Sequence, residues 1–119
     1  MKLRKEVLWF GRQMEAKLQE HDDDRGGWEN CDNRYLQDLL MQGAEELLVA
    51  CGILDDAIDR SCYSMEDVPL QQATIMHVIT EAADVANFAL MIADNARQIP
   101  PRLGLDVAHE DSINADDSD

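Results

Sequence analysis

The stretch EAADVANFALMIADNA, residues 81–96, decides the fold class of this chain. From Ala82 to Ala93 every position is apolar except Asp84 and Asn87. Ala, Leu and Met favour helix over strand, and a helix that is apolar on nearly all sides packs among other elements. The stretch therefore predicts a core helix. A carboxylate beside other protein is costly without a partner, so Asp84 indicates a ligand or a specific contact.

The composition of the whole chain supports an all-α fold. The 119 residues suffice for one hydrophobic core but not for two. Aromatic residues make up 5% of the chain, whereas Ala, Leu, Met, Gln and Glu are plentiful, which favours helix. We expect one helical-bundle domain over residues 1–103 and an acidic, mobile tail over residues 104–119, which has almost no large apolar residues.

Apolar periodicity places the helices. A first helix is expected over residues 2–20, and a second from residue 34 to about residue 50, with Gly52 just past its end. Residues 53–60 are expected to form a short helix or an extra turn or two. A third long helix is expected from about residue 64 to residue 97, because a hydroxyl cap precedes it and two prolines follow it. The apolar stripe of the first helix consists of Leu3, Val7, Phe10, Met14 and Leu18.

Charge and cysteine content narrow the class of function. A net charge of −15 disfavours direct binding to nucleic-acid phosphates or to anionic membranes. Acidic side chains could instead hold divalent cations, imitate nucleic acid on the surface of another protein, or only keep the chain soluble.

The cysteines Cys31, Cys51 and Cys62 show neither a disulfide framework nor zinc-ligand spacing. No signal-peptide core or membrane span is recognisable, so we expect a cytoplasmic protein.

Four polar residues of the stretch 81–96 share one helical face: Glu81, Asp84, Asn87 and Asp94. Carboxylates at positions i and i+3 can hold one Mg²⁺ or Mn²⁺ ion. The second helix offers further oxygens, and in an antiparallel bundle its acids could face Glu81 and Asp84 across a groove. The alternative is a solvated stripe with no ligand.

The segments HDDDRGGWENCDNRYLQDLL (21–40) and EAADVANFALMIADNA resemble the small phage and bacterial MazG-like proteins of the all-α NTP pyrophosphohydrolase superfamily. The resemblance covers roughly residues 1–98. Its sharpest parts are the E-x-x-D pattern at residues 81–84 and GGWENC at residues 26–31. It implies a helical bundle that dimerises or tetramerises. It also implies Mg²⁺-dependent cleavage of a nucleoside triphosphate between the α and β phosphates.

The resemblance also implies metal ligands from an E-E-x-x-E segment on the second helix. This chain has Gln42, Gly43 and Glu46 there, so an amide and a glycine replace two acids. A glycine inside a helix costs roughly 1 kcal/mol relative to alanine, which asks for a reason. Glu46, Glu81 and Asp84 remain as catalytic and metal-binding candidates, with Glu45 as a further metal candidate; the nucleotide-binding candidates are Asn87, Trp28 and Lys17.

Two classes of function follow. The first is a Mg²⁺-dependent or Mn²⁺-dependent nucleoside triphosphate pyrophosphohydrolase of the MazG-like type. The second is a catalytically inactive relative, of the kind that a phage encodes, which uses its acidic surface to bind and inhibit a host protein as a nucleic-acid mimic. The substitutions at Gln42 and Gly43 permit the second class.

Overall fold

The chain is all-α in the part that a computed structural model describes, residues 1–22, 27–61 and 68–104. The helices are α1 (Lys5–Glu20), α3 (Asn33–Ser61), α4 (Val68–Arg97) and the short α5 (Ile99–Arg102). No strand occurs in these ranges, which confirms the expected fold class. Of the tail expected to be mobile, residues 105–119 lie outside the described ranges.

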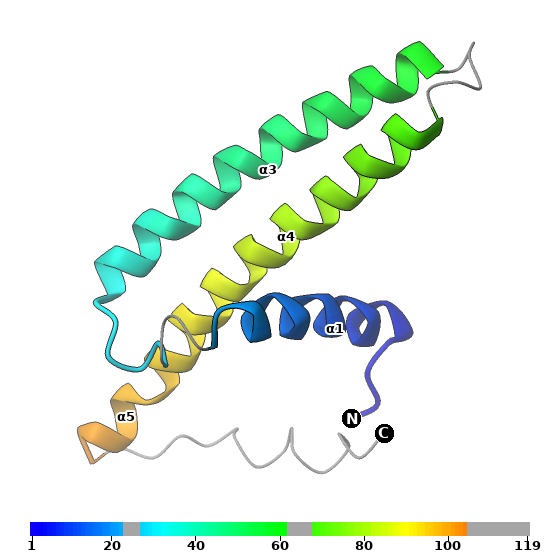
Figure 1. Ribbon diagram of the computed structural model, residues 1–119. Helices are drawn as coiled ribbons and strands as arrows, with labels where there is room; N and C mark the ends of the chain where they lie inside the picture. Colours follow the sequence, from blue (N-terminus) through cyan, green and yellow to red (C-terminus); the bar gives the residue numbers. More distant parts are fainter. Residues whose placement is uncertain (23–26, 62–67, 105–119) are drawn as a thin grey trace.

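Helices α3 and α4 form a long antiparallel hairpin, and α4 lies between α3 and α1 (Figure 1). At about 1.5 Å per residue, the 30 residues of α4 span about 45 Å. The side of α3 that faces α4 repeats every seven residues, as in a coiled coil. The buried positions of this repeat are Leu36, Gly43, Ala50 and Ala57.

Gly43 packs closely against α4. A Cβ atom at this position would lie 3.3 Å from Val85 Cγ2 and 3.6 Å from Phe88 Cε2. The first distance is tighter than ordinary van der Waals contact, so alanine would already press on Val85. The helical glycine therefore has a packing reason: it lets α3 and α4 approach each other.

The prediction that the second helix ends before Gly52 is wrong. Residues 53–60 form additional turns of the same helix, which is one of the two alternatives expected for them. Helix α3 continues from Asn33 to Ser61. The buried repeat continues through Ala50 and Ala57, whereas Gly52 lies on the exposed side. Continued packing outweighs a glycine penalty of about 1 kcal/mol.

The third long helix ends at Arg97, as expected, and Pro100 and Pro101 lie in the following α5. Its expected start near Ser64 falls outside the described residues.

Helix α1 packs on α4 and has no contact with α3 in the described part of the chain. Four members of the predicted stripe, Leu3, Phe10, Met14 and Leu18, are partly buried, but Val7 is 51% exposed. Figure 1 gives the reason: α1 meets α4 near its own C-terminal end and diverges from it towards its N-terminus. The first turns of α1 therefore keep an exposed apolar surface.

The segment Gln72–Arg102 is long and apolar enough to cross a membrane by length and composition. In this structure, α3 and α1 pack against α4, which contributes most of the segment, and 11% of its apolar window is buried.

Candidate functional site

The polar face of α4 is covered by α1 and by the loop that contains Trp28. Asn87 is 4% exposed, and its Nδ2 donates a hydrogen bond of 3.0 Å to the backbone oxygen of Met14. Its Oδ1 is buried and has no partner among the described residues. A buried acceptor without a donor is costly. Asn87 therefore anchors α1 on α4 and still has an acceptor to offer.

Asp84 lies one helical turn before Asn87, close to a cation of α1. Lys17 Nζ is 3.8 Å from Asp84 Oδ1 and 3.0 Å from Glu20 Oε2. The pKa of Lys17 is raised, first by the hydrogen bond with Glu20 and further by the nearby charge of Asp84. Lys17 thus keeps its positive charge beside Asp84, in a position suited to meet an anion.

Glu81 lies one turn before Asp84, at the N-terminal end of the same face. Its Oε1 is 3.2 Å from His77 Nε2. Its Oε2 is buried without a hydrogen-bond partner among the described residues. The side chain of Glu81 is 16% exposed, its Oε1 forms an ion pair with His77 when that ring is protonated, and its charge contributes to the raised pKa of Lys17.

The Trp28 loop is fastened to the C-terminal end of this face. The indole Nε1 of Trp28 donates a hydrogen bond of 2.9 Å to Asp94 Oδ2, and Arg97 Nε lies 2.7 Å from Asp94 Oδ1. Asn95 Nδ2 donates to the backbone oxygen of Trp28 at 3.2 Å. The hydrogen bond from Arg97, and after it the one from Trp28, lowers the pKa of Asp94. Asp94 therefore positions the loop.

Between α1, this loop and α4 lies a cavity of about 110 Å³. Pockets that enclose a drug-sized ligand measure about 300–1,000 Å³, so the cavity can enclose only part of a nucleotide. It brings together the three nucleotide-binding candidates and Asp84. Its lining residues are Lys17, Leu18, His21, Asp22, Trp28, Asp84, Asn87, Phe88 and Met91.

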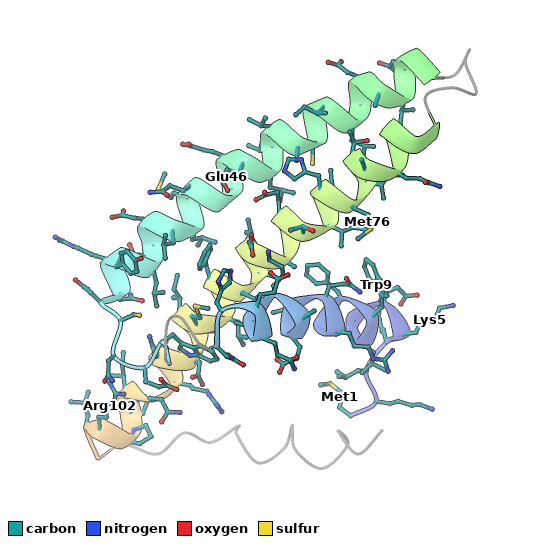
Figure 2. All side chains as sticks on the ribbon, in the orientation of Figure 1. Met1, Lys5, Trp9, Glu46, Met76 and Arg102 are labelled. Atoms are coloured by element: carbon teal, nitrogen blue, oxygen red, sulfur yellow. The ribbon has the colours of Figure 1, made fainter. Side chains whose placement is uncertain are left out.

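The acids of α3 lie apart from this face. Glu45 and Glu46 are both exposed, and Figure 2 shows Glu46 near the middle of α3. Gly43 packs on Val85 instead of presenting an oxygen. In residues 1–22, 27–61 and 68–104, no three His, Cys, Asp or Glu side chains lie close enough together to hold a metal ion.

Among the described acids of α4, Glu81 and Asp84 could hold a divalent cation, since Mg²⁺ is commonly held by one or two carboxylates together with substrate phosphates. They are one turn apart, and the buried Oε2 of Glu81 has no hydrogen-bond partner among the described residues. The donor set that the described residues provide is therefore this pair, with Glu46 outside it.

Sequence reasoning missed the contacts that build the site across the chain. Trp28 and Asp94 are 66 residues apart, and Met14 and Asn87 are 73 apart, so no local pattern links them. Phe88 and Met91 could have been found, because each lies about one turn after a residue of the polar face.

Searches of protein-family models, curated proteins and solved structures found no match for this chain. Its function is therefore inferred from its own residues.

Proposed function

We propose that this chain is a MazG-like nucleoside triphosphate pyrophosphohydrolase, which converts an NTP or dNTP into the monophosphate and pyrophosphate with Mg²⁺ or Mn²⁺. The observation that carries the proposal is that Glu81 Oε2 and Asn87 Oδ1, on either side of Asp84, are buried without a hydrogen-bond partner among the described residues; a third such oxygen of α4, Asn95 Oδ1, belongs to the residue that holds the Trp28 loop. A metal ion can bind the first oxygen, and a donor group of the nucleotide can bind the second.

In this proposal Glu81 and Asp84 hold the metal ion. The resemblance implies Glu46 as a third carboxylate, but Glu46 lies outside the donor set that the described residues provide. A bound Mg²⁺ neutralises phosphate oxygens and lowers the pKa of a bound water. Lys17 stays protonated next to Asp84 and contacts a phosphate oxygen.

Trp28 and Asn87 then hold the nucleoside. Trp28 lines the cavity, and its hydrogen bond with Asp94 fixes the indole ring in place. Asn87 Oδ1 accepts a hydrogen bond from a sugar hydroxyl or an exocyclic amino group. Because the cavity measures about 110 Å³, it encloses the base or the sugar and leaves the phosphates outside.

Pyrophosphate release from a panel of ribonucleoside and deoxynucleoside triphosphates tests this function. Asp84→Asn and Glu81→Gln should each lower turnover by about 100-fold or more, since each removes a charged metal ligand. Asp38→Asn, at an exposed acid of α3, is the matched control and should leave turnover unchanged. A native protein inactive on the whole panel with both metals rules the activity out.

The resemblance further supports a homodimer or homotetramer, and the cysteine pattern supports a cytoplasmic location, where free nucleotides occur. The net charge of −15 argues against direct binding to nucleic acid or to an anionic membrane.

A catalytically inactive relative is the second candidate. It is favoured by the packing of Gly43 against Val85, which leaves no room for a metal ligand, and by the acidic outer side of α3. Such a protein would present carboxylates to a basic groove of a host protein. Salt-sensitive capture of a host nucleic-acid-binding protein by the native chain, together with inactivity on the nucleotide panel, identifies this function. The exposed acids of α3 are Asp38, Glu45, Glu46, Asp55, Asp56 and Asp59.

A further inference from the structure

The first half of α1 has an outer face that no other helix covers in the described part of the chain. Lys5, Leu8, Trp9 and Arg12 follow one another at helical spacing, so they share one side of α1. All four are exposed, and Trp9 is 47% exposed. Among the described helices, α1 contacts only α4, with its opposite side. We call these four residues the outer face of α1.

This part of the chain is basic, although the whole chain has a net charge of −15. Lys5 and Arg12 stand at the two ends of the outer face, and neither forms an ion pair with another described residue. Two acids, Glu6 and Glu15, lie at its edges. Residues 1–12 nevertheless contain one carboxylate, Glu6, against four cations: Lys2, Arg4, Lys5 and Arg12.

Apolar surface lies between the two cations of this face. Leu8 and Trp9 are placed there by the helical spacing, and Figure 2 shows Lys5 and Trp9 near the N-terminal end of α1. An open hollow of about 360 Å³ is lined by Lys5, Glu6 and Trp9. An indole beside ammonium and guanidinium groups suits a ligand that carries both apolar groups and carboxylates.

A segment of this chain has that chemistry. Residues 105–119, which lie outside the described ranges, contain no Lys or Arg. Their branched apolar residues are Leu105, Val107 and Ile113. Six acids accompany them: Asp106, Glu110, Asp111, Asp116, Asp117 and Asp119.

The segment is long enough to reach the outer face. Gly104 ends the described part of the chain after α5, and Asn87 of α4 is hydrogen-bonded to Met14 of α1. The path from Gly104 along α5 and α4 to Asn87, and across to Arg12, measures about 40 Å, from about 1.5 Å per helical residue and about 8–10 Å between helix axes. Lys5 lies about 10 Å further along α1. Residues 105–119 span about 50 Å when extended, and straight lines are shorter than these paths.

We propose that the outer face of α1 binds residues 105–119 of the same chain. The carboxylates of the segment meet Lys5 and Arg12, and a branched apolar side chain of the segment packs on Trp9. Tethering gives such a segment an effective concentration in the millimolar range, which favours it over a free acidic peptide. The contact holds the first turns of α1, which diverge from α4 (Figure 1). It does not depend on the proposed nucleotide chemistry.

Nitrogen-15 NMR of the full chain tests the contact, with each change read at the other end of the chain. In a tail variant, the six acids of residues 105–119 are replaced by the corresponding amides. This variant should shift the indole Nε1–H resonance of Trp9, which Trp9→Phe identifies. The matched control replaces the six exposed acids of α3 in the same way and should leave that resonance in place. Conversely, Lys5→Gln with Arg12→Gln should shift the amide resonances of residues 110–117. Circular dichroism should show that all variants stay helical.

Competition with a synthetic peptide of residues 105–119 gives a second test. The tail variant should bind this peptide at least about tenfold more tightly than the native chain, whose own segment competes for the face. Added salt should weaken the binding. A Trp9 resonance that the tail variant leaves in place would overturn the proposal. Equal binding of the peptide by both chains would overturn it too, and would assign the face to an acidic segment of another protein. A Trp9 shift that depends on protein concentration would assign it to a second copy instead.

Discussion

Replacing Gly43 by glutamate would introduce the acid that the MazG-like pattern has at this position, but the structure predicts that it destabilises the fold. A Cβ atom alone would lie 3.3 Å from Val85 Cγ2 and 3.6 Å from Phe88 Cε2. Glutamate adds four more heavy atoms and a charge at the same place. The α3–α4 contact would have to open to admit them.

The expected change in unfolding free energy is the sum of one favourable and two unfavourable contributions. Removing a helical glycine gains about 0.5–1 kcal/mol. Overpacking a close contact costs about 1–3 kcal/mol, and a partly desolvated carboxylate adds to that cost. We therefore expect Gly43→Glu to lose about 2 kcal/mol of unfolding free energy. In a domain of this size that lowers the melting temperature by about 8 °C or more.

Urea and thermal unfolding followed by circular dichroism, at one protein concentration for all variants, measure this effect. A cycle of Gly43→Ala, Val85→Ala and the double variant isolates the contact. Gly43→Ala should be at least about 0.5 kcal/mol more favourable when Val85 is already alanine, because the new methyl group then has space. A Gly43→Glu variant as stable as the native chain would refute this packing.

Four further predictions concern the covered face of α4. Asn87→Leu should cost about 0.5–1.5 kcal/mol in urea unfolding, since it removes the hydrogen bond that joins α4 to the backbone of α1 at Met14. Because the pKa of Asp94 is lowered in the folded chain, the ionised carboxylate stabilises the fold above its ordinary pKa of 3.8. This stabilisation is lost as the pH falls through the pKa of the folded state, so the native chain should lose more stability than Asp94→Asn in acid titrations. The raised pKa of Lys17 acts in the opposite sense: the protonated amine stabilises the fold below its ordinary pKa of 10.5. This stabilisation is lost as the pH rises through the pKa of the folded state, so Lys17→Met should lose less stability than the native chain in strongly alkaline solution. Trp28→Phe should increase the acid resistance of the fold partway towards that of Asp94→Asn, because it removes one of the two hydrogen bonds that lower this pKa.

The fold class could be predicted because it depends on periodic patterns within single segments. The apolar run from Ala82 to Ala93 and the proline pair after Arg97 are local signals, and the structure agrees with both. The continuity of α3 could not be predicted in the same way. Gly52 is typical of a helix end, and only the burial of the opposite side of the helix against α4 explains why the helix continues.

The candidate site was predicted in part. Spacing alone places Glu81, Asp84 and Asn87 on one face, and the structure has them there. The partners of that face depend on where α1 and the Trp28 loop pack. Which side of α3 faces α4 also depends on tertiary packing around Gly43. The sequence therefore could not predict that Glu46 lies apart from the α4 carboxylates.

The central claim is that the face of α4 with Glu81, Asp84 and Asn87 binds a metal ion together with a nucleotide. Titration of Mn²⁺, followed by electron paramagnetic resonance, tests it directly in the presence of a nucleotide whose α–β bridge is a methylene group and cannot be cleaved. Binding should be at least about tenfold tighter with the nucleotide than without it, and Asp84→Asn and Glu81→Gln should each abolish this gain. Mn²⁺ binding that is insensitive to the nucleotide, or that both variants retain, would contradict the claim.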